Sequence, residues 1–215
     1  MSQETAHADA AANAGFWQEL ESWKTPAAKE VAPPVEVGSK APWSQYLRLP
    51  DGRPTIVVFL RHCGCPFAEK TFRSLTELSD KVPSVHCIAI SHSSAEATDR
   101  WLPQVGGTWA VDIVIDEERD LYAKWGLGIS STWHAVNPFT IWNAFSIGKS
   151  EGIWNRPTES GSRWQTSGAF AVDRDGTVRW THVDSTAHDV PDLRAAMTAL
   201  GFTPPDDKHH TKHDH

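Results

Sequence analysis

The stretch TIVVFLRHCGCPFAEKTFRSLTELSD, residues 55–80, decides the fold of this 215-residue chain. It begins with a continuous apolar run from Thr55 that is rich in β-branched residues, which predicts a strand buried on both faces of a sheet. After Pro66 the apolar residues recur every three or four positions, which predicts a helix with one apolar face. Proline is well tolerated at the first position of a helix. The sequence therefore places Cys65 at or near the N-cap of this helix.

An N-cap position favours negative charge, because unpaired backbone N–H groups and the positive end of the helix dipole lie there. Since the thiolate is the nucleophilic form of cysteine, Cys65 is a candidate redox nucleophile. The alternative is a buried structural thiol. Cys63 has two interpretations, a resolving thiol that forms a strained and easily reduced disulfide with Cys65, or an inert turn residue. Cys87 lies among apolar residues and is expected to be a core thiol.

The residues FLRHCGCPFAEK resemble the F-x-R-x-x-G-C-P-F-C-R-E turn of the peroxiredoxin-like branch of the AhpC/TSA group, in the thioredoxin-fold superfamily. This resemblance implies that Cys65 is the reactive cysteine of the family. Ala68 stands where the family has its second cysteine, which excludes a CxxC disulfide. His62 stands where orthodox peroxiredoxins have Thr or Ser, a departure unfavourable to efficient peroxide reduction. The other matching positions are Phe59, Arg61, Gly64, Pro66 and Phe67.

Further site residues are expected around this turn. Arg61 stays cationic and donates in a fixed fork, so it is the preferred group to stabilise the reactive cysteine or a peroxide oxygen. His62 either shares that task or only covers the turn. The resemblance also implies a loop facing the cysteine just before the last hairpin, where thioredoxin-type proteins have a cis-proline and this chain has none. The candidate substrate contacts are thus His62, Pro66, Trp164 and Thr166. Glu69 is expected to be a solvated helix residue rather than a proton shuttle.

The order of the expected elements indicates an α/β protein with a thioredoxin-like fold, a central mixed sheet flanked by helices. We expect one such domain over residues 35–203, with a Trp-rich insertion at 129–166 before the C-terminal hairpin. An N-terminal extension, residues 1–34, carries a short amphipathic helix, and residues 204–215 form a His-rich disordered tail. The other expected elements are an edge strand and an Asp51-Gly52 turn within 47–54, strands at 85–91 and 111–115, helices at 94–102 and after 116, a hairpin at 168–183 and a helix at 190–200.

Composition excludes several classes of protein. The net charge of −7, without a cluster of Lys and Arg, argues against binding to nucleic acid or to an anionic membrane surface. The N-terminus lacks the pattern of a secretory signal, and three cysteines fit a reducing compartment, so we expect a cytoplasmic protein. No nucleotide-binding or HExxH pattern is present, which predicts no cofactor. The histidines of the tail are able to bind a metal, but a solvated tail without a metal site is expected.

The leading hypothesis is a thiol-dependent oxidoreductase that reduces hydrogen peroxide or organic hydroperoxides. Cys65, Cys63 and Arg61 would be its catalytic residues, and thioredoxin or glutathione its external reductant. A second hypothesis is a thioredoxin-fold protein recruited to small-molecule thiol or biosynthetic chemistry, with an aromatic pocket built from the Trp-rich insertion. A third is an interaction module without catalysis. The aromatic content is compatible with a homodimer and with a monomer.

Overall fold

The core of the protein is a five-stranded mixed sheet with the strand order β3-β2-β1-β4-β5. The computed structural model describes residues 17, 21–130 and 138–204. The central strand β1 pairs in parallel with β2 and antiparallel with β4, as expected for a mixed sheet. The strands are β1 (Thr55–Phe59), β2 (His86–Ser91), β3 (Val111–Ile115), β4 (Gly168–Val172) and β5 (Val178–Val183).

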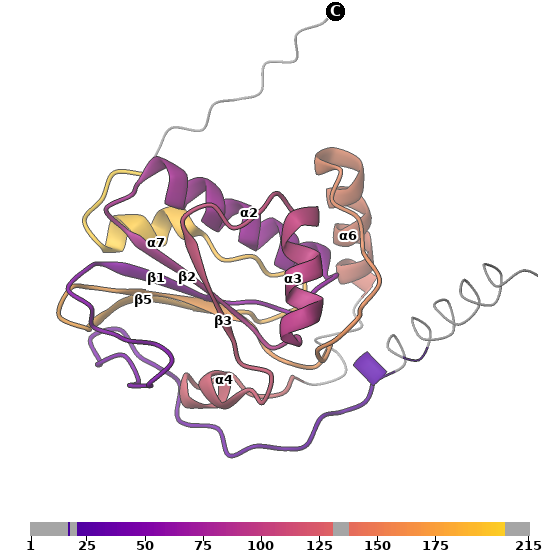
Figure 1. Cartoon of the computed structure of the whole chain (residues 1–215), viewed down its shortest axis with the longest axis horizontal. Coiled ribbons are helices and arrows are strands. Elements are labelled where there is room, and N and C mark those ends of the chain that lie inside the picture. Colours follow the sequence, from indigo (N-terminus) through magenta and orange to yellow (C-terminus); the bar gives the residue numbers. More distant parts are fainter. Residues whose placement is uncertain (1–16, 18–20, 131–137, 205–215) are drawn as a thin grey trace, which may run out of the picture.

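Helices cover both faces of this sheet (Figure 1). One face packs against α2 (Pro66–Lys81), α3 (Ala95–Gln104) and α7 (Leu193–Ala199). The other face packs against α4 (Asp120–Lys124) and the segment that precedes β1. Successive residues of a strand point to opposite faces, and for this reason Ile56 and Val58 lie in one core and Val57 and Phe59 in the other. The predicted α/β architecture is confirmed.

The predicted edge strand at 47–54 is wrong. Pro50 and Pro54 have no N–H to donate to a neighbouring strand, and this segment has no strand geometry. Leu47 and Leu49 instead fill the core on the α4 side. The sheet is extended earlier in the chain, where Lys40 forms an isolated antiparallel bridge with Thr177.

The predicted insertion includes α6 (Pro138–Glu151), which packs against α2. We call residues 152–167, which lead from α6 to β4, the return segment. Trp142, Phe145 and Trp154 are each more than half exposed, so these aromatic rings lie mainly at the surface. Trp133 of the predicted insertion lies outside the described residues. The same holds for Phe16 and Leu20 of the predicted N-terminal helix and for the His-rich tail from residue 205.

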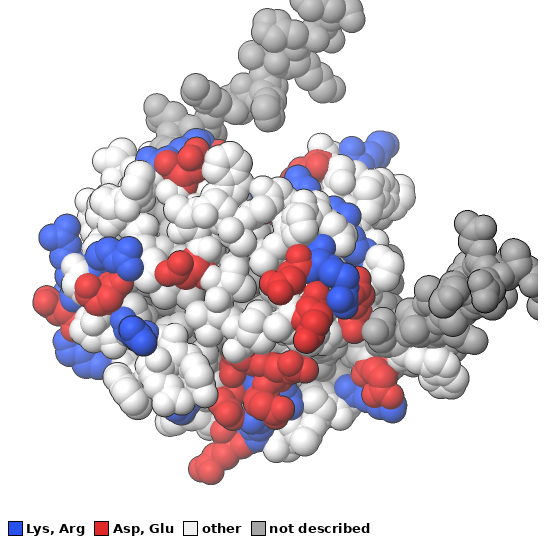
Figure 2. Space-filling view, viewed as in Figure 1, with Lys and Arg blue, Asp and Glu red and all other residues white. Residues whose placement is uncertain are grey.

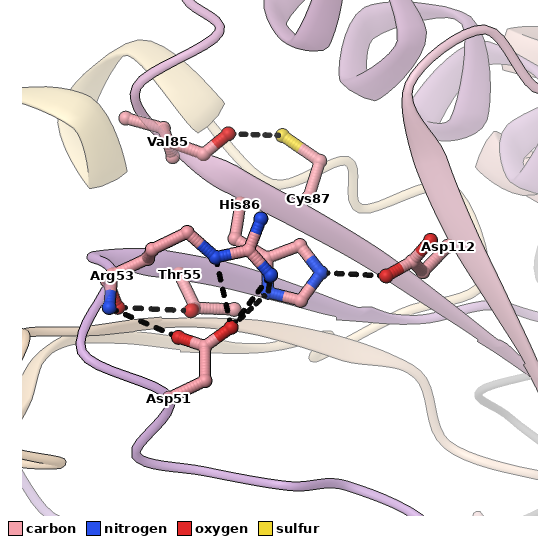
Figure 3. Close-up of polar contacts among 7 residues, drawn as sticks. All are labelled: Asp51, Arg53, Thr55, Val85, His86, Cys87 and Asp112. Atoms are coloured by element: carbon pink, nitrogen blue, oxygen red, sulfur yellow. Dashed lines mark hydrogen bonds and ion pairs between the residues drawn. The ribbon is translucent and has the colours of Figure 1, made fainter.

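A cluster of charged side chains lies at the amino ends of the parallel strands, opposite the edge where β1 leads to the cysteines (Figure 3). His86 at the start of β2 has one ring nitrogen 3.1 Å from Asp51 and the other 2.7 Å from Asp112. Although burial opposes it, hydrogen bonds from Arg53 lower the pKa of Asp51. This cluster fixes the segment before β1 to the sheet, remote from the cysteines.

On the face shown in Figure 2, basic and acidic side chains of the described residues are interspersed. Within the described part of the chain, no helix combines the length and the apolar character needed to cross a bilayer.

Candidate functional site

Cys65 is the N-cap residue of α2, as predicted. Its backbone is extended, with φ −71° and ψ 126°, and Pro66 occupies the first helical turn. The N–H of Cys65 donates to the carbonyl of His62 at 3.2 Å, which closes the turn after β1. At the start of any helix the first N–H groups have no acceptor within the helix. The N–H groups of Phe67 and Ala68, which have no acceptor within α2, therefore give this end of the helix its preference for negative charge.

The side chain of Cys65 is covered by the insertion. The residue is 5% exposed and belongs to an apolar cluster that includes Ile147 of α6 and Ile153 of the return segment. Phe67 and Ala68 complete this cluster on the α2 side. α6 and the return segment thus shield Cys65 from solvent.

The return segment rests directly on the cysteine turn. The N–H of Arg156 donates to the carbonyl of Gly64 at 3.0 Å. Gly64 has φ +98°, and a Cβ at this position would lie 2.8 Å from the carbonyl oxygen of Pro157. Only glycine fits this combination of a left-handed backbone and a close backbone neighbour.

Ion pairs also join the insertion to the domain. Glu69 is 1% exposed, so its predicted place on a solvated helix face is wrong. Its carboxylate accepts hydrogen bonds from Arg73 at 2.5 Å and from Nε of Arg156 at 3.0 Å. Two further pairs, Lys70 with Glu151 and Arg100 with Glu159, join α2 to α6 and α3 to the return segment at 2.6 Å each.

The thiol of Cys63 lies in a different environment from that of Cys65. Cys63 belongs to the large core that includes residues of α3, and its sulfur is 3.7 Å from Oγ1 of Thr98 and 3.9 Å from Oγ of Ser91. Burial raises the pKa of the Cys63 thiol. All three cysteines are free. Cys87 is fully buried, which confirms the predicted core thiol, and burial raises its pKa to about 12.

Arg61 and His62 follow β1 and are both buried. Arg61 donates from Nη2 to the carbonyl of Arg163 at 2.9 Å, whereas its Nε and Nη1 have no hydrogen-bond partner among the described residues. Both ring nitrogens of His62 also lack a partner there. Burial, followed by the charge of Arg61, lowers the pKa of His62 well below its usual value. His62 is therefore a neutral imidazole at neutral pH, and Arg61 is the cation of this pair.

The indole N–H of Trp164 and the backbone N–H of Thr166 are bound within the chain. Nε1 of Trp164 donates to the carbonyl of Trp23 at 2.9 Å, which docks the N-terminal segment. The N–H of Thr166 donates to the carbonyl of Gly128 at 3.0 Å. The side chain of Gln165 donates to the same carbonyl at 3.0 Å. The loop that has a cis-proline in thioredoxin-type proteins is thus tied to residues 127–130 by hydrogen bonds.

A polar group beside the turn consists of Ser167, at the end of the loop expected to face the cysteine, and Asp184, which was not predicted from the sequence. β5 runs in the same direction as β1, because each of them is antiparallel to β4. The residues after β1, those after β5 and those before β4 therefore meet at one edge of the sheet. This arrangement brings Asp184 and Ser167 close to Arg61, and all three line one cavity. The signal in the sequence for Asp184 was a carboxylate directly after the last strand of the hairpin.

Residues 71–186 match the family model described as AhpC/TSA antioxidant enzyme. The match begins inside α2, beyond the cysteine turn. A search of curated proteins found no match for the chain.

The chain is similar to several solved structures. A peroxiredoxin-like protein from Aquifex aeolicus has a TM-score of 0.57 at 12% identity, over 80% of this chain and 90% of that one. A cysteine-to-serine mutant of peroxiredoxin 6 from Arenicola marina has a TM-score of 0.55 at 12% identity, over 77% and 72%. A thiol peroxidase from Chromobacterium violaceum has a TM-score of 0.53 at 15% identity, over 83% and 94%. At identities this low, the structural similarity establishes the shared fold alone. It confirms the predicted thioredoxin-like class.

Proposed function

The chain belongs to the AhpC/TSA antioxidant enzyme family, and from this premise we propose that it is a thiol-dependent oxidoreductase of the peroxiredoxin type with Cys65 as its nucleophile. One observation carries the proposal: Cys65 is the N-cap residue of α2, directly after the buried central strand, with Pro66 in the first turn. In this place a thiolate is stabilised by the start of the helix. A family of antioxidant enzymes supplies a reaction for such a thiolate.

The proposed reaction oxidises the sulfur and reduces a peroxide. The thiolate attacks one oxygen of hydrogen peroxide or an organic hydroperoxide and the O–O bond breaks, which leaves a sulfenic acid and an alkoxide or hydroxide that takes up a proton. Arg61 stabilises the charge on the leaving oxygen. Its Nε and Nη1 suit this role, because they have no partner within the described residues.

An external thiol, from thioredoxin or glutathione, then regenerates the enzyme. It attacks the sulfenic sulfur, releases water and forms a mixed disulfide, and a second thiol reduces this bond. Cys63 is the internal alternative. Its sulfur lies among hydroxyl groups in the large core, while Cys65 belongs to the cluster under α6, so resolution by Cys63 requires the turn to rearrange.

The proposed substrate contacts are His62, Pro66, Trp164 and Thr166. His62 contributes two ring nitrogens that have no partner in the described part of the chain, and Pro66 walls the site beside the sulfur. Trp164 and Thr166 contribute apolar contact, since the indole N–H and the Thr166 N–H are already bound within the chain. The proposed setting is the cytoplasm, where free thiols such as those of this chain persist.

Peroxide turnover tests the proposal. Wild-type protein with excess thioredoxin or glutathione is expected to consume hydrogen peroxide or cumene hydroperoxide, and Cys65→Ser is expected to abolish consumption. Cys87→Ala is the matched control, because Cys87 is a buried thiol in the middle of a strand. Full turnover by Cys65→Ser would refute the proposal. Unchanged turnover by Cys63→Ser would show that the external thiol alone resolves the sulfenic acid.

A further inference from the structure

A small cavity lies behind the first turn of α2, at the edge of the sheet where β1 ends. Its volume is about 10 Å³, room for one water-sized molecule. Ala68 forms part of its wall, so the cavity occupies the space beside the position where a CxxC protein has its second cysteine. The polar residues that line it are Arg61, Thr71, Ser167, Asp184 and Asp189.

Two opposite charges without complete partners line this cavity. Arg61 is 5% exposed, and its Nε and Nη1 have no hydrogen-bond partner within the described residues. Asp184 is 6% exposed; its Oδ2 accepts a hydrogen bond from Oγ of Ser167, while its Oδ1 has none there. Leaving a buried polar group without a partner costs about 1–3 kcal/mol, and more for a charged one. One bridging molecule that accepts from one of these Arg61 nitrogens and donates to Oδ1 of Asp184 lowers both costs.

The surroundings of Arg61 single out Asp184 as its counter-charge. The charge of Arg61 acts on His62 and His92, and its Nη2 donates to the carbonyl of Arg163; the carboxylates that line the cavity with it are Asp184 and Asp189. Burial lowers the pKa of His92 to about 4, so His92 is neutral at neutral pH.

His182 is a second group that faces Asp184. Its Nε2 lies 3.4 Å from Oδ1 of Asp184 and 3.2 Å from Oδ1 of Asp189, and the interaction with Asp184 raises the pKa of His182. Asp189 also lines the cavity, but its Oδ2 accepts hydrogen bonds from the N–H and Oγ of Ser185 at 3.0 and 2.9 Å. Asp184 is the carboxylate with a buried oxygen that has no hydrogen bond among the described residues.

We propose that Arg61 and Asp184 are bridged in this cavity by one water-sized molecule, and that Asp184 thereby acts as a positioning residue that holds the Arg61 guanidinium and limits its stabilisation of the Cys65 thiolate. The inference rests on the proposed function, because it assigns Arg61 to the reactive cysteine. Phe67 and Ala68 connect the two places, since they wall the cavity and also pack in the cluster that contains Cys65. Glu69, the nearest carboxylate on α2, is paired with Arg73 and Arg156 and is not available to Arg61.

The test is the pH dependence of Cys65 alkylation by iodoacetamide, followed by peptide mass spectrometry. Asp184→Asn frees the charge of Arg61, so the midpoint of the pH–rate profile is expected to fall by at least about half a unit, about threefold in rate below the midpoint. In an Arg61→Gln background the same substitution is expected to shift the midpoint by less than half as much. Asp189→Asn is the control and is expected to leave the midpoint in place.

Other outcomes overturn the inference. An equal shift in both backgrounds would show that Asp184 acts on the thiolate directly, and no shift, or an equal shift in Asp189→Asn, would exclude the bridge. If Asp184→Asn does not fold, Ser167→Ala replaces it. Loss of the Ser167 hydrogen bond loosens Asp184, so the midpoint of the pH–rate profile is expected to shift in the same direction. An unchanged midpoint in Ser167→Ala would then overturn the inference.

Alkylation requires no peroxide. Failure of peroxide turnover with an intact Asp184 effect would therefore refute the proposed function alone, whereas normal turnover without this effect would refute only the bridge.

Discussion

Substitution of Gly64 by alanine tests whether the return segment rests on the cysteine turn. Gly64 has φ +98°, a conformation that costs an L-residue about 1–2 kcal/mol. Its Cβ would also lie 2.8 Å from the carbonyl oxygen of Pro157 and 2.9 Å from that of Arg156, so the segment must move away. The hydrogen bond from Arg156 to Gly64 is then lost, at about 1 kcal/mol. The expected loss of unfolding free energy is about 2–3 kcal/mol.

Gly38→Ala is the matched control. Gly38 has a similar φ of +92°, but a Cβ there has nothing within 4 Å, so only the backbone cost of about 1–2 kcal/mol applies. The difference of about 1 kcal/mol corresponds to about 2–4 °C in Tm for a chain of this size. Because the displaced segment uncovers Cys65, iodoacetamide should also alkylate Cys65 several times faster in Gly64→Ala alone. Equal Tm values and equal alkylation rates in the two variants would refute the covering contact.

Three further perturbations test other parts of the structure. His92 is buried with a pKa of about 4, against 6.5 unfolded, so about 3 kcal/mol of unfolding free energy is present above pH 6.5 and is lost as the pH falls to 4. Urea unfolding at several pH values should show that His92→Gln loses less unfolding free energy in acid than the wild type. An equal loss in the two proteins would contradict the assignment. Glu69→Gln should cost about 2 kcal/mol in urea unfolding, because it weakens a buried carboxylate with two Arg partners. Glu77→Gln, at an exposed carboxylate paired with Lys81, should cost less than about 0.5 kcal/mol. Equal costs in the two variants would show that the buried ion pairs of Glu69 stabilise the fold no more than an exposed pair. Ala68→Cys should convert peroxide oxidation from a sulfenic acid to a disulfide between Cys65 and the introduced thiol, seen by intact mass as loss of two hydrogens; a persistent sulfenic acid would show that position 68 does not face the sulfur.

Local sequence patterns were sufficient for the central part of the fold. The apolar run of β1, the helical period after Pro66 and the proline itself fixed the strand, the helix and the N-cap of Cys65, because each of these depends on neighbours within a few residues. The predicted edge strand at 47–54 failed for a tertiary reason. Leu47 and Leu49 are apolar because they fill a core, not because they alternate along a strand.

The surroundings of the cysteine depend on contacts between distant parts of the chain. Glu69 looked solvated because Arg156, which pairs with it, is 87 residues away in the sequence. Arg61 and Asp184 meet only because β5 returns to the edge of the sheet where β1 ends. The cover over Cys65 depends on how α6 packs on α2, which no local period specifies.

The most direct test of the account is to locate the sulfenic acid. Wild-type protein is exposed briefly to hydrogen peroxide in the presence of dimedone, then digested and analysed by mass spectrometry. If Cys65 is the reacting thiol, one dimedone adduct is expected, on the peptide that contains Cys65, and none in Cys65→Ser. An adduct confined to Cys63 or Cys87, or no adduct while the protein stays folded, would contradict the role of Cys65 as the reacting thiol.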